Sequence, residues 1–213
     1  MAETHESVET AVRAPRWSKP LRRIGLVAFL ALLLFVSSVS KFDPEKMGDN
    51  HQIFLPLLGF GCAIAEGQGL RYFGRYLLLE TLIKGPKFAL GDHPINIRPT
   101  GGDQGFPSGH TAAAAFGATA LVQTCLKDSR WAQGAAIVTA GFVGSSRIEA
   151  GKHTIWQVLA GALVGWLSQA LALVGFDRGI RRVWFGARPL ALRVWRRGYA
   201  ALMAGEVPED RGR

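Results

Sequence analysis

The segment 106–111, which reads Phe-Pro-Ser-Gly-His-Thr, brings together residues that could bind an anion. Pro107 and Ser108 mark the start of a helix, and the alanine run that follows predicts the helix itself. The unpaired N–H groups of a first helical turn carry the positive end of the helix dipole, and Gly109 lets an anion approach the backbone closely. His110 adds a titratable donor at the same place. The segment is therefore a candidate phosphate site. Taken alone, however, such a segment is more often an ordinary capped helix with a surface histidine.

Two further segments carry cations and a second histidine. Upstream, Arg98-Pro99 lies in a Gly-rich loop, with Lys84 and Lys87 before it. Downstream, residues 146–153 read Ser-Arg-Ile-Glu-Ala-Gly-Lys-His. Guanidinium groups form planar, charge-assisted hydrogen bonds to phosphate oxygens. The three segments together therefore favour phosphate chemistry over a structural role.

These segments resemble the signature of the type-2 phosphatidate phosphatase superfamily over about residues 50–175. The signature is Lys-six residues-Arg-Pro, then Pro-Ser-Gly-His, then Ser-Arg-five residues-His-three residues-Asp. The middle segment matches completely, and the third matches as far as His153 but has Gln157 in place of the aspartate. The first matches only at Arg98-Pro99, because position 91, where the lysine belongs, is a glycine.

The resemblance implies that His153 is the nucleophile that takes the phosphoryl group and that His110 is the acid that protonates the leaving group. It also implies a set of phosphate-binding groups: Lys87 (with Lys84 as the reserve), Arg98, the hydroxyl and N–H of Ser108, the N–H of Gly109, and Arg147. Imidazole can serve both as an unprotonated nucleophile and as a protonated acid near pH 7.

Gln157 is the point at which the sequence departs from the family. In the family the aspartate orients the nucleophilic histidine, and Gln157 lies one helical turn after His153, within reach of its ring. Its carbonyl can accept the Nδ1–H bond but lacks the charge, and an Asp→Asn change in a Ser-His-Asp triad costs on the order of 10⁴ in turnover. We therefore expect Gln157→Asp to be at least as active as the wild type. Glu149 and Asp103 are the alternative partners.

Composition favours a membrane protein over a nucleic-acid-binding one. The 213 residues are 48% hydrophobic yet carry a net charge of +9, because cations gather at the two ends and apolar runs fill the middle. The sequence lacks a basic stripe interleaved with aromatic residues, the pattern that would indicate a nucleic-acid partner. Cys62 and Cys125 lie in apolar runs, so we expect small buried side chains rather than a disulfide. We expect no metal and no cofactor, because the carboxylates have no metal-ligand spacing.

The apolar runs predict an all-α bundle of six transmembrane helices. They cover residues 24–40, 52–65, 70–82, 109–126, 131–145 and 154–176. The first run is about long enough to cross a bilayer, with a cleaved signal peptide as its alternative. Residues 41–51 read as a loop, and 89–106 as a long functional loop. Gly161 and Gly165 have the spacing of a helix-packing face.

The distribution of arginines predicts the topology. We expect a cytoplasmic tail at 1–23, a transmembrane phosphatase domain at 24–176, and a basic amphipathic cytoplasmic tail at 177–213. Both termini then lie in the cytoplasm of a bacterial-type inner (plasma) membrane protein. The three motif segments all fall at the opposite, extracytoplasmic face.

The sequence thus predicts a metal-independent phosphatase that removes a phosphomonoester or diphosphate from a membrane lipid through a phosphohistidine. A lipid phosphotransferase and a catalytically impaired lipid-phosphate binder or transporter are the alternatives. The expected partners are the lipid substrate and the membrane, and the sequence leaves the oligomeric state open.

Overall fold

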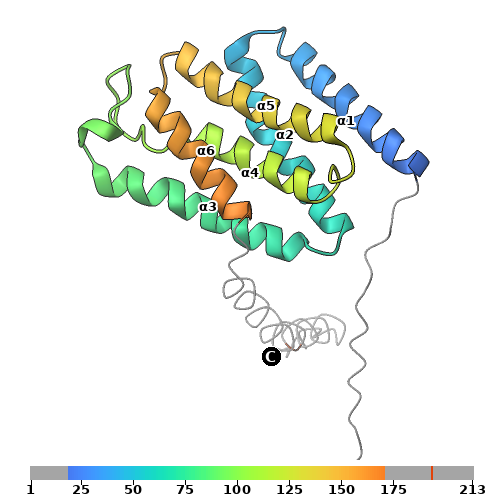
Figure 1. Ribbon diagram of the computed structural model, residues 1–213. Coiled ribbons are helices and arrows are strands. Elements are labelled where there is room, and N and C mark those ends of the chain that lie inside the picture. Colours follow the sequence, from blue (N-terminus) through green and yellow to red (C-terminus); the bar gives the residue numbers. More distant parts are fainter. Residues whose placement is uncertain (1–18, 171–192, 194–213) are drawn as a thin grey trace, which may run out of the picture. The chain divides into compact units, whose positions relative to one another are not determined.

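The computed structural model describes residues 19–170 and Arg193, and within these the chain is helical (Figure 1). The elements are α1 (Lys19–Val39), α2 (Pro44–Ala65), α3 (Gly69–Leu90), the short 3-10 helix η1 (Pro94–Asn96), α4 (Gly109–Gln123), α5 (Arg130–Glu149) and α6 (Ile155–Ala170). The all-α expectation is confirmed. The N-terminal tail was expected at 1–23, but residues 19–23 form the start of α1 and residues 1–18 lie outside the described residues. The tail expected at 177–213 also lies outside them, apart from Arg193.

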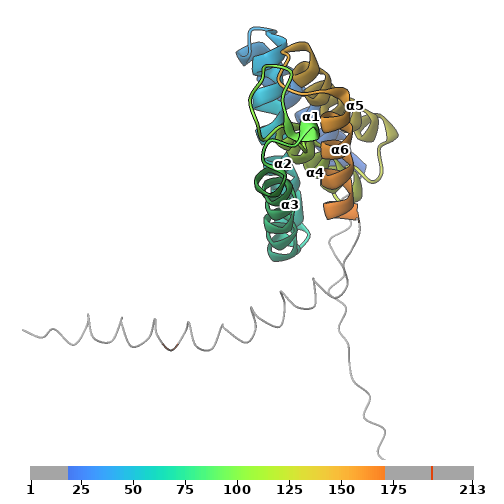
Figure 2. The same cartoon turned by 90° about the vertical axis from the view of Figure 1, so that its left-hand side faces the viewer.

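Helix α4 is the centre of the bundle and packs against α2, α5 and α6 (Figures 1 and 2). Its alanines favour helix and leave room for close neighbours. Ala112, Ala114, Phe116 and Ala120 are each fully buried. A helix that is apolar all round is expected in such a central position.

Two glycines of α6 allow the closest of these approaches. A Cβ added to Gly161 would collide with the carbonyl of Ser108, and one added to Gly165 would collide with the carbonyl of Ala112. The small-residue spacing read from the sequence is therefore a packing face. It holds α6 directly against the first turns of α4, where the motif histidine His110 lies.

The expectation of a loop over residues 41–51 is wrong, because α2 begins at Pro44. Asp43 is the N-cap residue, and its carboxylate accepts a hydrogen bond of 3.1 Å from the N–H of Lys46. Pro44 occupies the first helical position and Glu45 lies in the first turn, where the helix dipole favours a negative charge. These two extra turns bring Asp49 to the end of the bundle that carries the motif segments.

The cysteines do not remain single buried thiols. Cys62, near the end of α2, and Cys125, just after α4, form a disulfide with a Cα–Cα distance of 5.8 Å. Sequence reasoning treated each as a small apolar residue and did not bring the two helix ends together. The disulfide ties α2 to α4 about 20 Å from His110, since α4 rises 1.5 Å per residue.

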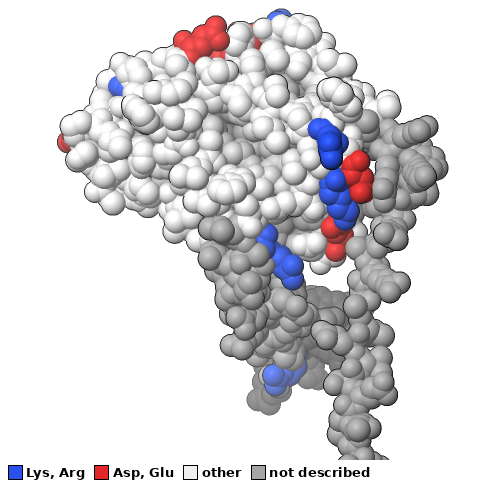
Figure 3. Space-filling model, in the orientation of Figure 1, with Lys and Arg blue, Asp and Glu red and all other residues white. Residues whose placement is uncertain are grey.

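The surface of the bundle is rich in large apolar side chains. Leu34 on α1, Phe88 on α3, Trp131 on α5 and Trp156 on α6 are all more than 60% exposed. Figure 3 shows a face on which the charged side chains lie near the margins, with a broad uncharged area between them. Within residues 19–170, however, none of the helices combines the length and the apolar composition needed to cross a membrane.

Candidate functional site

The motif segments converge at one end of the bundle. The loop 91–108, the start of α2, the end of α5 and the start of α6 lie together there in both views (Figures 1 and 2). At this end, His153 follows α5 and is almost completely buried, with 4% of its surface exposed. Its Nδ1 lies 3.1 Å from Oε1 of Gln157. Because an amide oxygen can only accept, Nδ1 carries the proton and Nε2 keeps its lone pair.

Gln157 has hydrogen-bond partners on both sides of its amide. Oε1 also accepts from the N–H of Thr154 at 3.2 Å. Nε2 donates to the carbonyl of Ile95 at 2.9 Å and to that of Ile97 at 2.8 Å. A carboxylate has no donor for those two carbonyls. The amide therefore joins the histidine to the loop that carries Arg98, which an aspartate at this position could not do.

Asn96 fixes the same loop from within. It is fully buried, and its Nδ2 donates to the carbonyls of Lys87 at 3.1 Å and Gly91 at 2.8 Å. Its Oδ1 accepts from the N–H of Phe106 at 3.0 Å. One side chain thus connects the end of α3, the start of the loop and the segment that leads into α4. Such a satisfied buried network makes the loop a rigid support.

Lys87 and Arg98 face a common point. Lys87 Nζ donates to the carbonyl of Gln104 at 2.6 Å, and Arg98 Nη2 lies 3.4 Å from the same oxygen. Gln104 adopts a left-handed backbone with φ of 61°, which is uncommon outside glycine. The Nε of Arg98 is buried and has no hydrogen-bond partner. Two cations and a free buried donor make a site suited to an anion.

The environment of His153 favours its neutral form. Burial, with the nearby charges of Lys87 and Arg98, lowers the pKa of His153 from 6.5 to about 4. The hydrogen bonds to Gln157 and to the backbone of Gly105 oppose this shift without reversing it. At pH 7 the ring is therefore unprotonated at Nε2, as a nucleophile must be.

The second histidine lies in a different set of contacts. His110 Nε2 is 3.1 Å from Asp49 Oδ1, and Arg147 Nη1 is 2.7 Å from the same oxygen. Arg147 also donates from Nη2 to the carbonyl of Glu45 at 2.6 Å. The charge of Lys87 acts on both histidines.

Both groups of Ser108 that the sequence assigned to phosphate have partners within the protein. Its N–H donates to the carbonyl of Gln157 at 2.9 Å, and its hydroxyl lies 3.0 Å from Thr111 Oγ1. The residue is fully buried and precedes α4 at the N-cap position without a side-chain capping bond. The N–H therefore ties the start of α4 to α6, and the hydroxyl bonds within the first turn of α4. Gly109, by contrast, lines the cavity described below.

The alternatives raised by the sequence lie elsewhere. Lys84 is exposed and pairs with Glu80 at 3.1 Å, so Lys87 is the lysine at the loop. Glu149 and Asp103 are both exposed, and the side chain that contacts His153 is that of Gln157. Among residues 19–170, His, Cys, Asp and Glu side chains do not form a group that could hold a metal ion.

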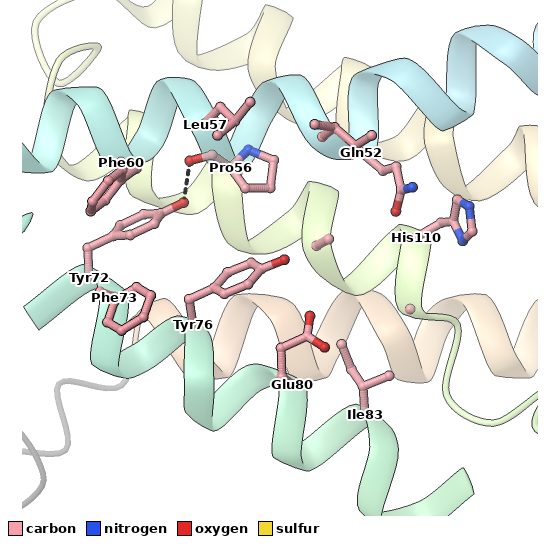
Figure 4. Close-up of a pocket in the computed structure, with 13 residues that line it drawn as sticks. Gln52, Pro56, Leu57, Phe60, Tyr72, Phe73, Tyr76, Glu80, Ile83 and His110 are labelled. Atoms are coloured by element: carbon pink, nitrogen blue, oxygen red, sulfur yellow. Dashed lines mark hydrogen bonds between the residues drawn. The ribbon is translucent and has the colours of Figure 1, made fainter.

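A largely apolar cavity of about 540 Å³ opens between α2, α3 and α4 (Figure 4). His110 and Gln52 lie at one end of it, and Phe60, Tyr72 and Phe73 lie toward the other. Tyr72 donates its hydroxyl to the carbonyl of Pro56 at 2.6 Å, so this polar group is satisfied. The cavity thus extends from a catalytic candidate into apolar surroundings.

The family comparison agrees with this geometry. The family model described as the PAP2 superfamily matches residues 72–181, about half of the chain. The chain belongs to the PAP2 superfamily. Membership implies phosphatase-type chemistry in general. No curated protein and no solved structure matches the chain.

Three residues of the site were missed by sequence reasoning: Asp49, Asn96 and Gln104. Asp49 was placed in a loop, although Asp43-Pro44-Glu45 is a helix-start signal that could have corrected the boundary. Asn96 and Gln104 act through hydrogen bonds to and from the backbone of a loop that has no periodic pattern. No signal in the sequence marks either of them.

Proposed function

We propose that this PAP2 superfamily member hydrolyses a phosphomonoester or diphosphate of a membrane lipid through a phosphohistidine on His153, without a metal ion. The observation that carries the proposal is the buried, neutral His153 beside Lys87, Arg98 and the unpartnered Nε of Arg98. A nucleophile next to fixed cations is what transfer of a phosphoryl group requires, because the cations offset the charge of the equatorial oxygens.

The reaction then has two steps. Nε2 of His153 attacks phosphorus, the bond to the leaving oxygen breaks, and His110 gives that oxygen a proton. A water molecule next attacks the phosphohistidine, gives a proton back to His110, and releases inorganic phosphate. Gln157 holds Nδ1–H of His153 throughout, so that the attacking nitrogen is always Nε2.

A lipid substrate is supported by the cavity that reaches His110. Its walls are mostly apolar and aromatic side chains of α2 and α3, with Gln52 and Glu80 as polar exceptions, and its volume of about 540 Å³ is in the range of ligand pockets. The exposed apolar residues of α1, α3, α5 and α6 support contact with a bilayer. The headgroup would meet the cations while the chain stays in apolar surroundings.

We further propose a multi-pass protein of the inner membrane, with the active site on the extracytoplasmic side. The support is the arginine excess near both ends of the sequence, which favours the cytoplasm for both termini. The loop 91–108 lies at the opposite end of α4 from Lys127 and Arg130, which also favour the cytoplasmic side.

The test is phosphate release from a panel of lipid phosphates and diphosphates by purified protein in detergent, with EDTA present. We expect release, a covalent phosphoenzyme after rapid acid quench, and loss of both in His153→Ala. Loss of donor phosphate without release would indicate transfer to an acceptor lipid instead. Binding without either reaction would indicate a lipid-phosphate binder, and strict dependence on added Mg²⁺ would contradict the mechanism.

A further inference from the structure

Asp49 bridges the second histidine and a buried arginine. It lies near the start of α2, five residues after Pro44, and its side chain is 46% exposed. One of its oxygens, Oδ1, contacts His110 Nε2 at 3.1 Å and Arg147 Nη1 at 2.7 Å. The motif signature that marks His110 and Arg147 includes no residue from this part of the chain.

Arg147 fixes where the carboxylate can lie. The guanidinium is 97% buried, and each of its three nitrogens has a partner. Nη1 donates to Asp49, Nη2 to the carbonyl of Glu45 at 2.6 Å, and Nε to Ser146 Oγ at 3.3 Å. Two of the partners are on α2 and one is on α5. Because the arginine has no freedom to turn, Oδ1 is held at one position relative to His110.

Close packing of α2 on α5 makes the bridge possible. At Gly48 a Cβ would collide with Ser146 Oγ and would lie 2.8 Å from Arg147 Nη2. Only a glycine lets the two helices approach closely enough for Arg147 to reach the backbone of Glu45. The position of Asp49 is thus set by helix packing and not by a flexible loop.

We propose that Asp49 is the positioning residue of His110. By accepting the Nε2–H bond it fixes the ring and stabilises the imidazolium, so that Nδ1–H is the proton given to the leaving oxygen. This inference rests on the function proposed above and assigns a residue to its acid step. After the transfer, His110 is neutral with its remaining proton on Nε2, still bonded to Asp49. When water attacks the phosphohistidine, Nδ1 takes up a proton and the starting state returns.

The two histidines then have partners of opposite kind, matched to their tasks. The nucleophile, His153, is bonded to the neutral amide of Gln157, which does not favour a positive ring. The acid, His110, is bonded to a carboxylate, which favours the protonated ring. The two partners thus differ in the direction expected for an acid and a nucleophile at one site, while burial and the charge of Arg147 act against the protonated form of His110.

The test uses the dependence on the leaving group. A poor leaving group such as an alkoxide needs a proton in the transition state, whereas 4-nitrophenolate leaves with little help. We therefore compare kcat/KM for decyl phosphate with kcat/KM for 4-nitrophenyl phosphate. For each substrate, kcat/KM reports the steps from substrate binding up to formation of the phosphoenzyme. General acid catalysis is worth about 10²- to 10⁴-fold. For Asp49→Asn we expect a loss of about 10²-fold or more on decyl phosphate and less than about 10-fold on 4-nitrophenyl phosphate.

Two controls accompany this comparison. Glu149→Gln removes a carboxylate two residues from Arg147 that is exposed and outside the site, and both substrates should keep their rates. Competitive inhibition by inorganic phosphate should be no weaker in Asp49→Asn than in the wild type, because binding of the phosphate is not the step affected. Asp49→Ala should regain part of its rate on decyl phosphate when formate is added, since the position is open to solvent.

Equal losses on the two substrates would overturn the role of Asp49, because they would mean that it serves only to anchor Arg147. Weaker inhibition by phosphate, with unchanged selectivity between the substrates, would overturn it in the same way. If the wild type hydrolysed neither substrate nor any lipid phosphate, the proposed function would fail first and this inference with it. The two failures are therefore distinguishable.

Discussion

The side chain of Gln157 explains how a glutamine can stand where the family signature has an aspartate. Oε1 accepts the hydrogen bond from His153, and Nε2 donates to the carbonyls of Ile95 and Ile97. A carboxylate could not donate to those two carbonyls. The residue is 1% exposed, so water cannot replace those bonds. The expectation from sequence, that Gln157→Asp would be at least as active as the wild type, stays a prediction, and the two hydrogen bonds that Nε2 donates weigh against it.

We predict that Gln157→Glu lowers both stability and turnover, although it is the closest match in size. Its second oxygen would face two carbonyl oxygens, and each acceptor left without a donor costs about 1–3 kcal/mol. Thermal unfolding and kcat measured in the same detergent check this. Wild-type stability with higher turnover in Gln157→Glu would show that charge matters more than the two lost donors.

The lowered pKa of His153 predicts a dependence of stability on pH. Between pH 6.5 and about 4, the unfolded histidine binds a proton that the folded one does not, so the folded state loses stability as the pH falls through this window. Above pH 6.5 both states are neutral and the effect vanishes. We expect the Tm of the wild type to fall more steeply from pH 7 to 4 than that of His153→Asn. Parallel curves for the two proteins would contradict a lowered pKa.

At the scale of elements, the motif segments located the functional end of the bundle, and the alanine run located α4. The boundaries of α2, α3 and α5 were less well predicted, and α3 runs to Leu90 instead of ending at residue 82. Hydrophobic periodicity detects a helix by its apolar face. The first turns of α2 carry polar residues toward the site, so they show no such period. For the same reason α5 was ended before Arg147, although the helix continues to Glu149. Sequence patterns thus fail where a helix end is used for chemistry.

Two glycines on α2 give a matched test of helix packing. Gly48 lies against Ser146 and Arg147, whereas a Cβ at Gly61 would meet nothing within 4 Å. We predict that Gly48→Ala destabilises the protein by about 1–3 kcal/mol and lowers activity, because the helices must separate. Gly61→Ala should raise stability by up to about 1 kcal/mol, through helix propensity alone. Chemical unfolding of the two variants, with activity assays, measures the contrast. Similar changes in stability at both positions would mean that helix propensity alone determines the effect of each substitution.

At the scale of the whole molecule, the apolar runs predicted an all-helical bundle, but the sequence did not predict the disulfide between Cys62 and Cys125. A disulfide requires two side chains to meet in space, and the sequence separation of 63 positions between these cysteines gives no sign of that contact. The link lies at the end of the bundle away from His110, near Lys127, whose Nζ pairs with Glu66 at 3.1 Å. That end is the one the arginine distribution assigns to the cytoplasm, where disulfides are rare.

The proposed orientation places a disulfide on the cytoplasmic side, and labelling of an introduced cysteine can test that orientation. Gly102 is exposed in the loop 91–108, and a Cβ there would meet nothing within 4 Å, so Gly102→Cys should be tolerated. With Cys62→Ser and Cys125→Ser in the same chain, the new cysteine is the single thiol. We predict that intact cells label it with a membrane-impermeant maleimide. The same chain with glycine kept at 102 is the control and should stay unlabelled.

Labelling at 102 only after the membrane is broken would reverse the orientation. The end with the disulfide would then face the oxidising side, and the phosphate site would face the cytoplasm, where its lipid phosphate would have to be made. Labelling from outside would instead place both cysteines on the reducing side, and the native pair should then be thiols in the cell. Alkylation of the native cysteines in freshly lysed cells, before any oxidation, decides between thiols and a disulfide. Labelling at 102 from outside together with native thiols, or labelling only in broken cells together with a native disulfide, would establish the side from which the substrate enters.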